Sequence, residues 1–422
     1  MSLRRLTGLR RRRHAATDTG FTGGNEVELL RGGDALFPRM HAAIRAAHNE
    51  VWLATYIFHH DPTSLALADA LIAADRRGVR VRLVIDGFGS NASVRTLAER
   101  FAGTGVAMAV FRPMDRWWRW FQPGQLRRLH QKLCVVDGHV AFVGGINVID
   151  DRLDLHHGTS ELPRLDFAVE LRGSVVAGVA QSVRAIWSRA WLGREFDDAL
   201  LDYLPLRRRL GLWLSQVWRG PQRLPDPAQP LPPVSAAFVL RDNLRRRRTI
   251  EHAYADAIAQ ASASVDIICP YFYPGQRIRQ ALRRAADRGV RVRLLLQGKL
   301  DYRIAGWAAE ALYAELLGHG VEIYEYTPAF LHAKVAVVDG QWATVGSSNI
   351  DPLSLLVNLE ANVVVLDAPF AARLAGEIDA AIAVSKRVSE SGGQGLRAML
   401  RRAVVAWFAY VFLRVAGAAG RY

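Results

Sequence analysis

The sequence predicts an α/β protein made of two duplicated α-β-α lobes, with mixed, mostly parallel sheets that pack face to face. Three observations lead to this fold class. Half of the 422 residues are apolar, which is enough for a large core. A segment typical of a helix, a turn and a buried strand occurs twice, and a polar block with a fixed spacing also occurs twice. The active site is therefore expected at the pseudo-two-fold interface between the lobes.

The first repeat predicts a strand–helix–strand unit in each half of the chain. Residues 73–87 are echoed by residues 284–298, and each copy is typical of a helix end, a glycine turn and a buried strand. Strands are expected over 51–58 and 265–269, each followed by an amphipathic helix. Because a helix links the two strands of each unit, the strands should be parallel, with a right-handed crossover.

The second repeat carries polar residues in a fixed frame. Leu-His-x-Lys, followed by Asp-Gly, occupies residues 129–138 and again residues 331–340, and a Gly-x-x-Asn block follows each copy. The histidine and the asparagine are 17 positions apart in both copies, from 130 to 147 and from 332 to 349. Two copies indicate a duplicated domain and not a solenoid, which needs at least three repeats.

Histidine and lysine in this block share one face of the expected strand, because side chains i and i+2 point to the same side. Asp-Gly favours a hairpin, so the returning strand brings the asparagine back beside the histidine. Lysine and asparagine can bind the oxygens of a phosphate, while histidine attacks phosphorus or donates a proton. With two halves, one histidine attacks and the other protonates the leaving alcohol.

The repeated blocks supply the candidate site residues. The candidate catalytic residues are His130, Lys132, Asp137, His332, Lys334 and Asp339. Asn147 and Asn349 are expected to bind the phosphate. The two aspartates are open to a second interpretation, in which they are only turn and ion-pair residues.

The charge balance predicts a polyanionic partner. Lys and Arg total 55 against 40 Asp and Glu, which gives a net charge of +15 and a pI near 10.4. Such a chain should meet nucleic acid or an anionic lipid surface, and the 11 tryptophans favour the membrane. Cys134 and Cys269 lie in apolar runs, which excludes a disulfide framework and a cysteine-rich zinc site and suits a reducing compartment.

Two aromatic segments with arginine neighbours are expected to contact the membrane surface. No apolar stretch reaches the ~20 residues of a spanning helix, and none follows the basic N-terminus, so neither a span nor a signal peptide is expected. Residues 403–413 are typical of an interfacial anchor, or alternatively of a helix packed on the core. Residues 116–121 are also suited to stacking on nucleic-acid bases. The expected membrane-contact residues are Trp117, Trp118, Trp120, Phe121, Trp407 and Phe408.

Composition divides the chain into five segments. Residues 1–24 form a basic arm, which is either disordered or in contact with lipid headgroups. Residues 25–200 form the first lobe and residues 235–385 the second. Between them, residues 201–234 are a basic linker rich in tryptophan and proline, and residues 386–422 are a basic, apolar and amphipathic tail.

Two groups of adjacent histidines raise the question of a metal site: His59-His60-Asp61 and His156-His157. Adjacent residues of a strand point to opposite sides, so such a pair rarely supplies two ligands. His59 follows the first strand at its C-terminal end, where open sheets bind ligands. These histidines are therefore expected to line the pocket, and no metal is expected.

The motif His-x-Lys-x-x-x-x-Asp followed by Gly-x-x-Asn, present twice, resembles the phospholipase D superfamily over residues 25–379. Within that superfamily, the residues around each motif are similar to those of bacterial cardiolipin synthases of the B type. The resemblance implies the phospholipase D fold, a phosphohistidine intermediate, and no metal or other cofactor. Gly145 stands where the superfamily usually has serine, whereas Ser347 keeps its hydroxyl in the expected phosphate pocket.

The resemblance also implies a carboxylate that orients the second ring nitrogen of the histidine. Within each half, this role is assigned to Glu360 for His332 and to Asp166 for His130. Both carboxylates are alternatively surface residues of edge strands. Family analogy favours His130 as the nucleophile.

The expected function is that of a cardiolipin synthase. A phosphatidyl group moves from a phosphatidylglycerol-type donor to histidine, releasing glycerol or another headgroup alcohol, and the hydroxyl of phosphatidylglycerol then attacks. A phospholipase D hydrolase is the alternative, because the same geometry serves water. A nuclease of the superfamily and a non-enzymatic binding module are disfavoured by the duplicated motif and the tryptophan-rich segments.

The expected partners follow from this function. They are phosphatidylglycerol or phosphatidylethanolamine and an anionic membrane surface, with no nucleic acid. The expected location is peripheral, on the cytoplasmic face of the bacterial inner membrane. Donor preference and oligomeric state stay open.

Overall fold

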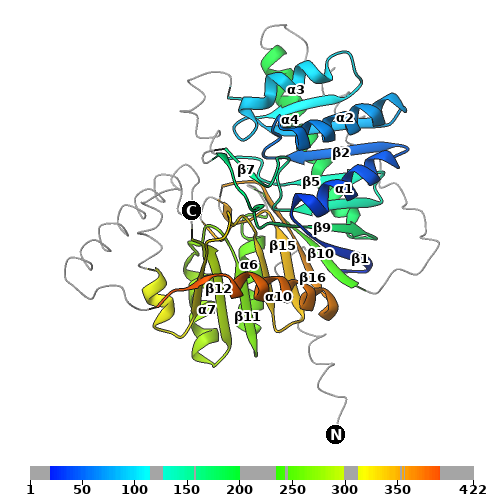
Figure 1. Cartoon of the computed structure of the whole chain (residues 1–422). Coiled ribbons are helices and arrows are strands. Elements are labelled where there is room, and N and C mark those ends of the chain that lie inside the picture. The colour runs from blue at the N-terminus through cyan, green and yellow to red at the C-terminus, as the bar shows by residue number, and fades with distance from the viewer. Residues whose placement is uncertain are drawn as a thin grey trace.

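In the part of the chain that the structure describes, a continuous sheet of 15 strands runs through both halves (Figure 1). The computed structural model describes residues 20–114, 127–155, 158–199, 234–242, 246–298, 312–351, 354–355 and 357–389. The strands of the first half are β1 (Thr22–Arg31), β2 (Glu50–Thr55), β3 (Arg80–Asp86), β4 (Ala107–Phe111), β5 (Leu133–Val136), β6 (Val140–Gly144) and β9 (Phe167–Arg172). Those of the second half are β10 (Val234–Arg241), β11 (Ser264–Ile268), β12 (Arg291–Gln297), β13 (Glu322–Tyr326), β14 (Val335–Val338), β15 (Trp342–Gly346), β16 (Glu360–Leu366) and β17 (Lys386–Arg387). A separate small hairpin pairs β7 (Leu153–Asp154) with β8 (Gly158–Thr159).

The helices cover both faces of this sheet. They are α1 (Gly32–Arg45), α2 (Pro62–Arg76), η2 (Asn91–Ser93), α3 (Val94–Phe101), α4 (Val176–Ala199), α6 (Thr249–Gln260), α7 (Gln276–Asp287) and α10 (Ala368–Ala383). Asp61 begins α2 by accepting the backbone N–H of Ser64, and Asp367 begins α10 in the same way through Phe370. In the part of the chain that the structure describes, no helix combines the length and the apolar character needed to cross a bilayer.

The two halves of the sheet have the same internal order, as the sequence repeat predicts. The order is β1-β9-β6-β5-β2-β3-β4 in one half and β10-β16-β15-β14-β11-β12-β13 in the other. The predicted strand–helix–strand units are β2-α2-β3 and β11-α7-β12, and both strand pairs are parallel. Gly78 and Gly289 lie between helix and strand with φ of 88° and 83°, a conformation that favours glycine. The predicted α/β fold and its repeated units are therefore confirmed.

The predicted balance of strand directions is wrong in detail. Among the described strands of the large sheet, the pairs within β2-β3-β4 and β11-β12-β13 are parallel and the other pairs are antiparallel. The two halves also join edge to edge through β1 and β10, and do not pack as two separate sheets face to face. The reason is that helical crossovers produce only the parallel part of each half, while hairpins such as β5-β6 and β14-β15 add antiparallel strands.

Three apolar clusters hold the layers together. One cluster joins α1, α2 and α3 to the first half of the sheet, and another joins α6 and α7 to the second half. The third cluster lies on the opposite face and spans both halves. There, α4 of the first half also contacts β10, and α10 of the second half also contacts β1. Val183 and Trp187 of α4 and Leu374 and Ile378 of α10 are all buried in this shared cluster. The halves therefore share a core.

Asp137 and Asp339 occupy tight turns at the far end of the motif strands. Both have positive φ, 52° and 50°, and both precede a glycine, as the hairpin signal predicts. The Asp137 carboxylate accepts the backbone N–H groups of His48, Asn49 and Glu50 at 2.8 Å. The Asp339 carboxylate accepts those of residues 262–264 at 2.8–2.9 Å. The prediction that these aspartates are catalytic is wrong, because β5 and β14 separate their carboxylates from the histidines.

Replacing either aspartate by alanine should therefore lower stability and leave the chemistry of the folded protein intact. We expect Asp339→Ala and Asp137→Ala each to lower the free energy of unfolding by about 1–3 kcal/mol, since three backbone N–H groups lose a charged acceptor. Urea unfolding measures this loss, and kcat at a temperature where both proteins are folded is the control. A loss of kcat beyond tenfold in a fully folded variant would contradict the structural assignment.

Candidate active site

Two short backbone bridges bring the repeated motifs together between the halves. Leu129 pairs in parallel with Leu359, and Leu165 pairs in parallel with Leu331. The His130 N–H donates to the carbonyl of Leu359 at 3.0 Å, and the His332 N–H donates to that of Leu165 at 2.9 Å. Each motif histidine is thus anchored on a segment of the opposite half.

The carboxylate partners of the histidines are exchanged between the halves. His130 Nδ1 lies 3.0 Å from a carboxylate oxygen of Glu360, and His332 Nδ1 lies 2.6 Å from Asp166 Oδ2. The prediction paired Glu360 with His332 and Asp166 with His130, and it is wrong in both cases. The alternative that both carboxylates lie on the surface is also wrong, because Asp166 and Glu360 are buried.

The exchange of partners follows from the backbone bridges between the halves. Asp166 directly precedes β9 and Glu360 begins β16, so each carboxylate lies one residue beyond a leucine of the backbone bridges. Those bridges pair the Asp166 segment with the His332 segment, and the Glu360 segment with the His130 segment. Spacing along the chain could identify the carboxylates but could not identify their partners.

The two motif lysines lie deep in the same interface. Lys132 is 6% exposed and Lys334 is 1% exposed, and each Nζ donates to the backbone carbonyl of its own motif histidine. Burial lowers the pKa of Lys132 to about 7 and that of Lys334 to about 8. Repulsion by Lys334 contributes to the first shift, and repulsion by Arg164 contributes to the second. A phosphate bound between them would supply the negative charge that restores their protonated forms.

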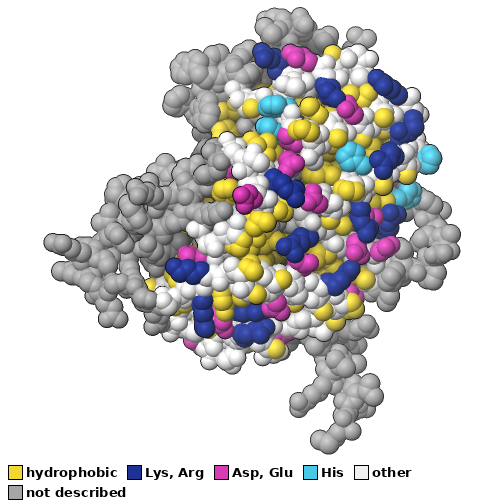
Figure 2. Space-filling view, in the orientation of Figure 1, with side chains coloured by type: hydrophobic (Ala, Val, Ile, Leu, Met, Phe, Trp, Pro, Cys, Tyr) yellow, Lys and Arg dark blue, Asp and Glu magenta, His cyan; other side chains and the backbone are white. Residues whose placement is uncertain are grey.

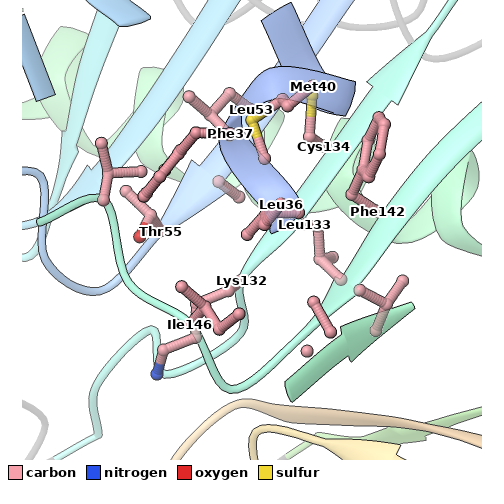
Figure 3. A pocket seen from close by; sticks show the side chains of 15 residues that line it. Leu36, Phe37, Met40, Leu53, Thr55, Lys132, Leu133, Cys134, Phe142 and Ile146 are labelled. Atoms are coloured by element: carbon pink, nitrogen blue, oxygen red, sulfur yellow. The ribbon is translucent and has the colours of Figure 1, made fainter. Parts of the chain in front are cut away.

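Lys132 stands at the border of the first-half core. Its aliphatic chain lines a small apolar cavity with Phe37, Leu53 and Ile146, among other apolar side chains. Figure 3 shows its nitrogen directed away from these apolar side chains. The stem therefore packs in the core while the ammonium group serves the polar interface, as is common for lysine.

The two histidine–carboxylate pairs are electrostatically different. Burial lowers the pKa of His130, although Glu360 opposes this shift, and burial together with Lys334 lowers the pKa of His332 further. Burial raises the pKa of Asp166 to about 7. Burial also acts to raise the pKa of Glu360, but His130 and Lys132 outweigh it and hold that pKa below its ordinary value. Glu360 is thus the more firmly ionised carboxylate.

The glycine–serine difference between the halves is explained by these carboxylates. Ser347 Oγ donates to Glu360 at 2.5 Å. At the matching position of the first half, a Cβ on Gly145 would collide with the carboxylate of Asp166. The expectation that this hydroxyl serves the phosphate is therefore corrected: Ser347 supports Glu360, and glycine makes room for Asp166.

The two asparagines also differ between the halves, in their hydrogen-bond partners. Asn147 Oδ1 accepts the backbone N–H of Ile57 at 3.3 Å. Asn349 is 8% exposed, and its Oδ1 has no hydrogen-bond partner among the described residues. Asn147 follows β6 and Asn349 follows β15, the strands that return from the motif strands. Their closeness to the histidines and their contact with phosphate stay predictions.

Sequence reasoning missed three residues that shape the site. The Tyr56 ring lies 5.0 Å from the His130 ring and 5.4 Å from Lys132 Nζ. Asp86 accepts the N–H of Leu129 at 2.8 Å, and Gln297 accepts that of Leu331 at 2.9 Å, so both anchor the residue before a motif histidine. The signal for the last two was available, because Asp86-Gly87 and Gln297-Gly298 end the first repeat at matching positions.

The remaining predicted residues fall into two groups. His59 and His60 stack with ring centroids 4.2 Å apart, and their Nδ1 atoms bond to Asp61 and Ser93. In the described part of the chain, no group of three His, Cys, Asp or Glu side chains is arranged to hold a metal ion. The following lie outside the described residues: Trp117, Trp118, Trp120, Phe121, His156, His157, Trp407, Phe408, residues 1–19 of the arm, and most of the linker.

Residues 40–159 and 254–382 match the family model described as cardiolipin synthase, phospholipase D-like domain. The chain belongs to this family. The membership confirms the resemblance drawn from the repeated motif, and the matched ranges contain both histidine–lysine pairs.

Relatives of this family are similar over most of the chain. Cardiolipin synthase B of Salmonella typhimurium is 36% identical over 374 residues, covering 88% of this chain and 84% of the relative. Cardiolipin synthase B of Escherichia coli is 35% identical over 360 residues, covering 85% and 81%. The crystal structure of phosphatidylserine synthase from Haemophilus influenzae shares the fold, with a TM-score of 0.64 at 14% identity, covering 93% of this chain and 95% of that one.

The exchanged pairing predicts which histidine responds to which carboxylate. Because Glu360 favours the charged form of His130, Glu360→Gln should lower the pKa of His130 and leave that of His332 nearly unchanged. Asp166→Asn should instead move the ring signals of His332. NMR titration of protein labelled with ¹³C-histidine measures both effects.

The matched control is Glu377→Gln, which removes an exposed partner of Arg31 and should move neither histidine. If Glu360→Gln shifted His332 and spared His130, the carboxylates would be paired within the halves and the exchange described above would be wrong.

Proposed function

We propose that this protein is a cardiolipin synthase, which transfers a phosphatidyl group from a phosphatidylglycerol-type donor to phosphatidylglycerol through a phosphohistidine. The observation that carries the proposal is the exchange of carboxylates, which supports two buried imidazoles, each oriented by the opposite half. A nucleophile and an acid are both needed at one phosphorus, and two such imidazoles supply them.

The reaction uses both histidines in two steps. In the first, Nε2 of one histidine attacks phosphorus, and the bond from phosphorus to the glycerol oxygen breaks. The other histidine gives its proton to that oxygen, so glycerol leaves as a neutral alcohol. In the second step, the same histidine takes the proton of an acceptor hydroxyl, whose oxygen attacks phosphorus and releases the first histidine. The Nδ1–H of the attacking imidazole donates to its carboxylate, which stabilises the imidazolium form.

Lys132 and Lys334 balance the charge that develops on the phosphoryl oxygens. They are buried in the interface and directed from the two halves, so low local polarity strengthens their attraction for an anion. Asn349 supports this role because its amide lacks a hydrogen-bond partner for Oδ1 among the described residues. No metal ion is required by this chemistry.

A purified sample should convert phosphatidylglycerol in mixed micelles to cardiolipin and glycerol in equal amounts. His130→Ala and His332→Ala should each abolish turnover, because neither histidine can replace the other. Lys132→Ala and Lys334→Ala should lower the rate by about 10²–10³. Lipid chromatography with glycerol quantification measures both products.

His319→Ala is the matched control for the histidine variants. His319 also has a carboxylate partner, Asp287 at 2.8 Å, but it is exposed and lies outside the interface. Phosphatidic acid as the only lipid product would establish the hydrolase instead. Near-normal synthesis by either folded motif variant would rule out the two-histidine reaction.

We also propose that the protein works peripherally on the cytoplasmic face of the bacterial inner membrane. The support is the net charge of +15 and four exposed apolar side chains in loops: Phe88, Leu155, Leu162 and Tyr271, each 43–51% exposed. The Phe88 ring contacts Arg128, two residues before His130. On the face seen in Figure 2, basic and acidic side chains of the described residues are interspersed and form no continuous basic patch. Apolar loops and overall charge, and not one basic stripe, are the basis of the proposed contact.

Sedimentation with vesicles tests this contact. The protein should pellet with phosphatidylglycerol vesicles at low salt and be partly released at high salt, because surface attraction is screened. Phe88→Ser combined with Leu162→Ser should weaken pelleting, while Val384→Ser, which removes another exposed apolar side chain, should not. Equal pelleting by all variants would remove these loops from the proposed contact.

A further inference from the structure

One residue beside the first motif breaks the symmetry of the duplication. Arg128 lies two residues before His130, and Phe330 occupies the matching position before His332. In an extended segment, residues i and i+2 face the same side, so Arg128, His130 and Lys132 form one row. Tyr56 supports this placement: its ring contacts His130 and Lys132, and the charge of Arg128 acts on its hydroxyl.

Arg128 is buried and has one carboxylate neighbour, with which it makes no hydrogen bond. Its side chain is 12% exposed, and its guanidinium lies 3.7 Å from Asp86, within ion-pair distance but beyond hydrogen-bond distance. The oxygens of Asp86 are already occupied by the backbone N–H groups of Leu129, Phe88 and Gly89. Arg128 donates only to weaker acceptors, the carbonyl of Arg112 at 3.2 Å and the sulfur of Met114.

Two further arginines add positive charge at this point. Arg112 donates to the carbonyl of Arg127 at 3.2 Å, so the three guanidinium-bearing residues are linked through their backbones. Among the residues that the structure describes, neither Arg112 nor Arg127 has a carboxylate within ion-pair distance. Burial and then repulsion by Arg127 and Arg128 lower the pKa of Arg112 to about 10. The cluster thus carries more positive charge than its surroundings neutralise.

We propose that Arg128, together with Arg112 and Arg127, binds the phosphodiester of the acceptor lipid while its hydroxyl reacts at the histidines. This inference rests on the proposed function and deepens it, because a synthase that joins two phospholipids must accommodate a second phosphate. The anion site is present in one half only, since Phe330 offers no charge at the matching position.

The spacing suits the product of the reaction. Two residues along an extended chain span about 6.6 Å. Two phosphates on the outer hydroxyls of one glycerol are joined by a five-atom chain of similar length. With the reacting phosphorus between the imidazoles, the second phosphate therefore falls within reach of Arg128, whichever histidine forms the bond to phosphorus.

A pair of soluble inhibitors tests the second phosphate site. Glycerol 1,3-bisphosphate carries both phosphates, whereas glycerol 1-phosphate carries one. Both are titrated against consumption of a short-chain, soluble phosphatidylglycerol by the full-length protein. The wild type should bind the bisphosphate at least tenfold more tightly. Arg128→Gln should lose about 10- to 100-fold of this advantage, since a charge-assisted contact is removed, and Arg128→Lys should recover part of it.

Arg164→Gln is the matched control, because Arg164 has the same side-chain exposure of 12% but lies near His332 and is paired with Asp154. It should keep the bisphosphate advantage, and thermal unfolding checks that both variants are folded. The proposal is overturned if Arg128→Gln keeps the advantage, weakens both inhibitors alike, or is matched by Arg164→Gln.

Product analysis separates this inference from the function on which it rests. Wild-type protein that releases only phosphatidic acid would disprove the synthase, while the inhibitor ratio would still report whether Arg128 binds a second phosphate. A synthase whose Arg128→Gln variant makes cardiolipin with an unchanged KM for the acceptor would disprove the inference alone.

Discussion

Four ionisable groups, Lys132, Lys334, Asp166 and Glu360, are buried in one interface, and their mutual neutralisation is the constraint on which the site depends. A buried charge without a partner is strongly destabilising, so neither half could keep its lysine and carboxylate in this arrangement alone. The backbone bridges at Leu129 and Leu165 bring the opposite charges together. The shared cluster under α4 and α10 then holds the two halves in that position.

The same constraint shapes the chemistry. Burial depresses the pKa of both histidines and both lysines, which keeps nucleophilic imidazole available but makes the ammonium groups less certain to be charged in the empty site. An incoming phosphate shifts this balance back towards protonated lysine. Binding and charging are therefore coupled, because an anion between the lysines favours their protonated forms.

Much of the architecture could be predicted from local patterns in the sequence. Periodicity and the glycine turns identified β2-α2-β3 and its repeat, and strand alternation placed histidine and lysine on one face. The partners of Asp166 and Glu360 could not be predicted, because they depend on backbone bridges between residues 166 and 230 positions apart. Asp137 and Asp339 were misread for a different reason: they recur with the motif, but they recur because a tight turn needs them.

Carrying both halves on one chain has a consequence for how such a site can diverge. In a dimer of identical subunits every substitution appears twice, once on each side of the symmetry axis. A glycine that makes room for Asp166 would then also remove the hydroxyl that supports Glu360. Fusion of the two copies frees each position to change singly. Two pairs of matching positions differ in this way: Gly145 matches Ser347, and Arg128 matches Phe330. In a strictly symmetric dimer, neither difference could arise in one copy alone.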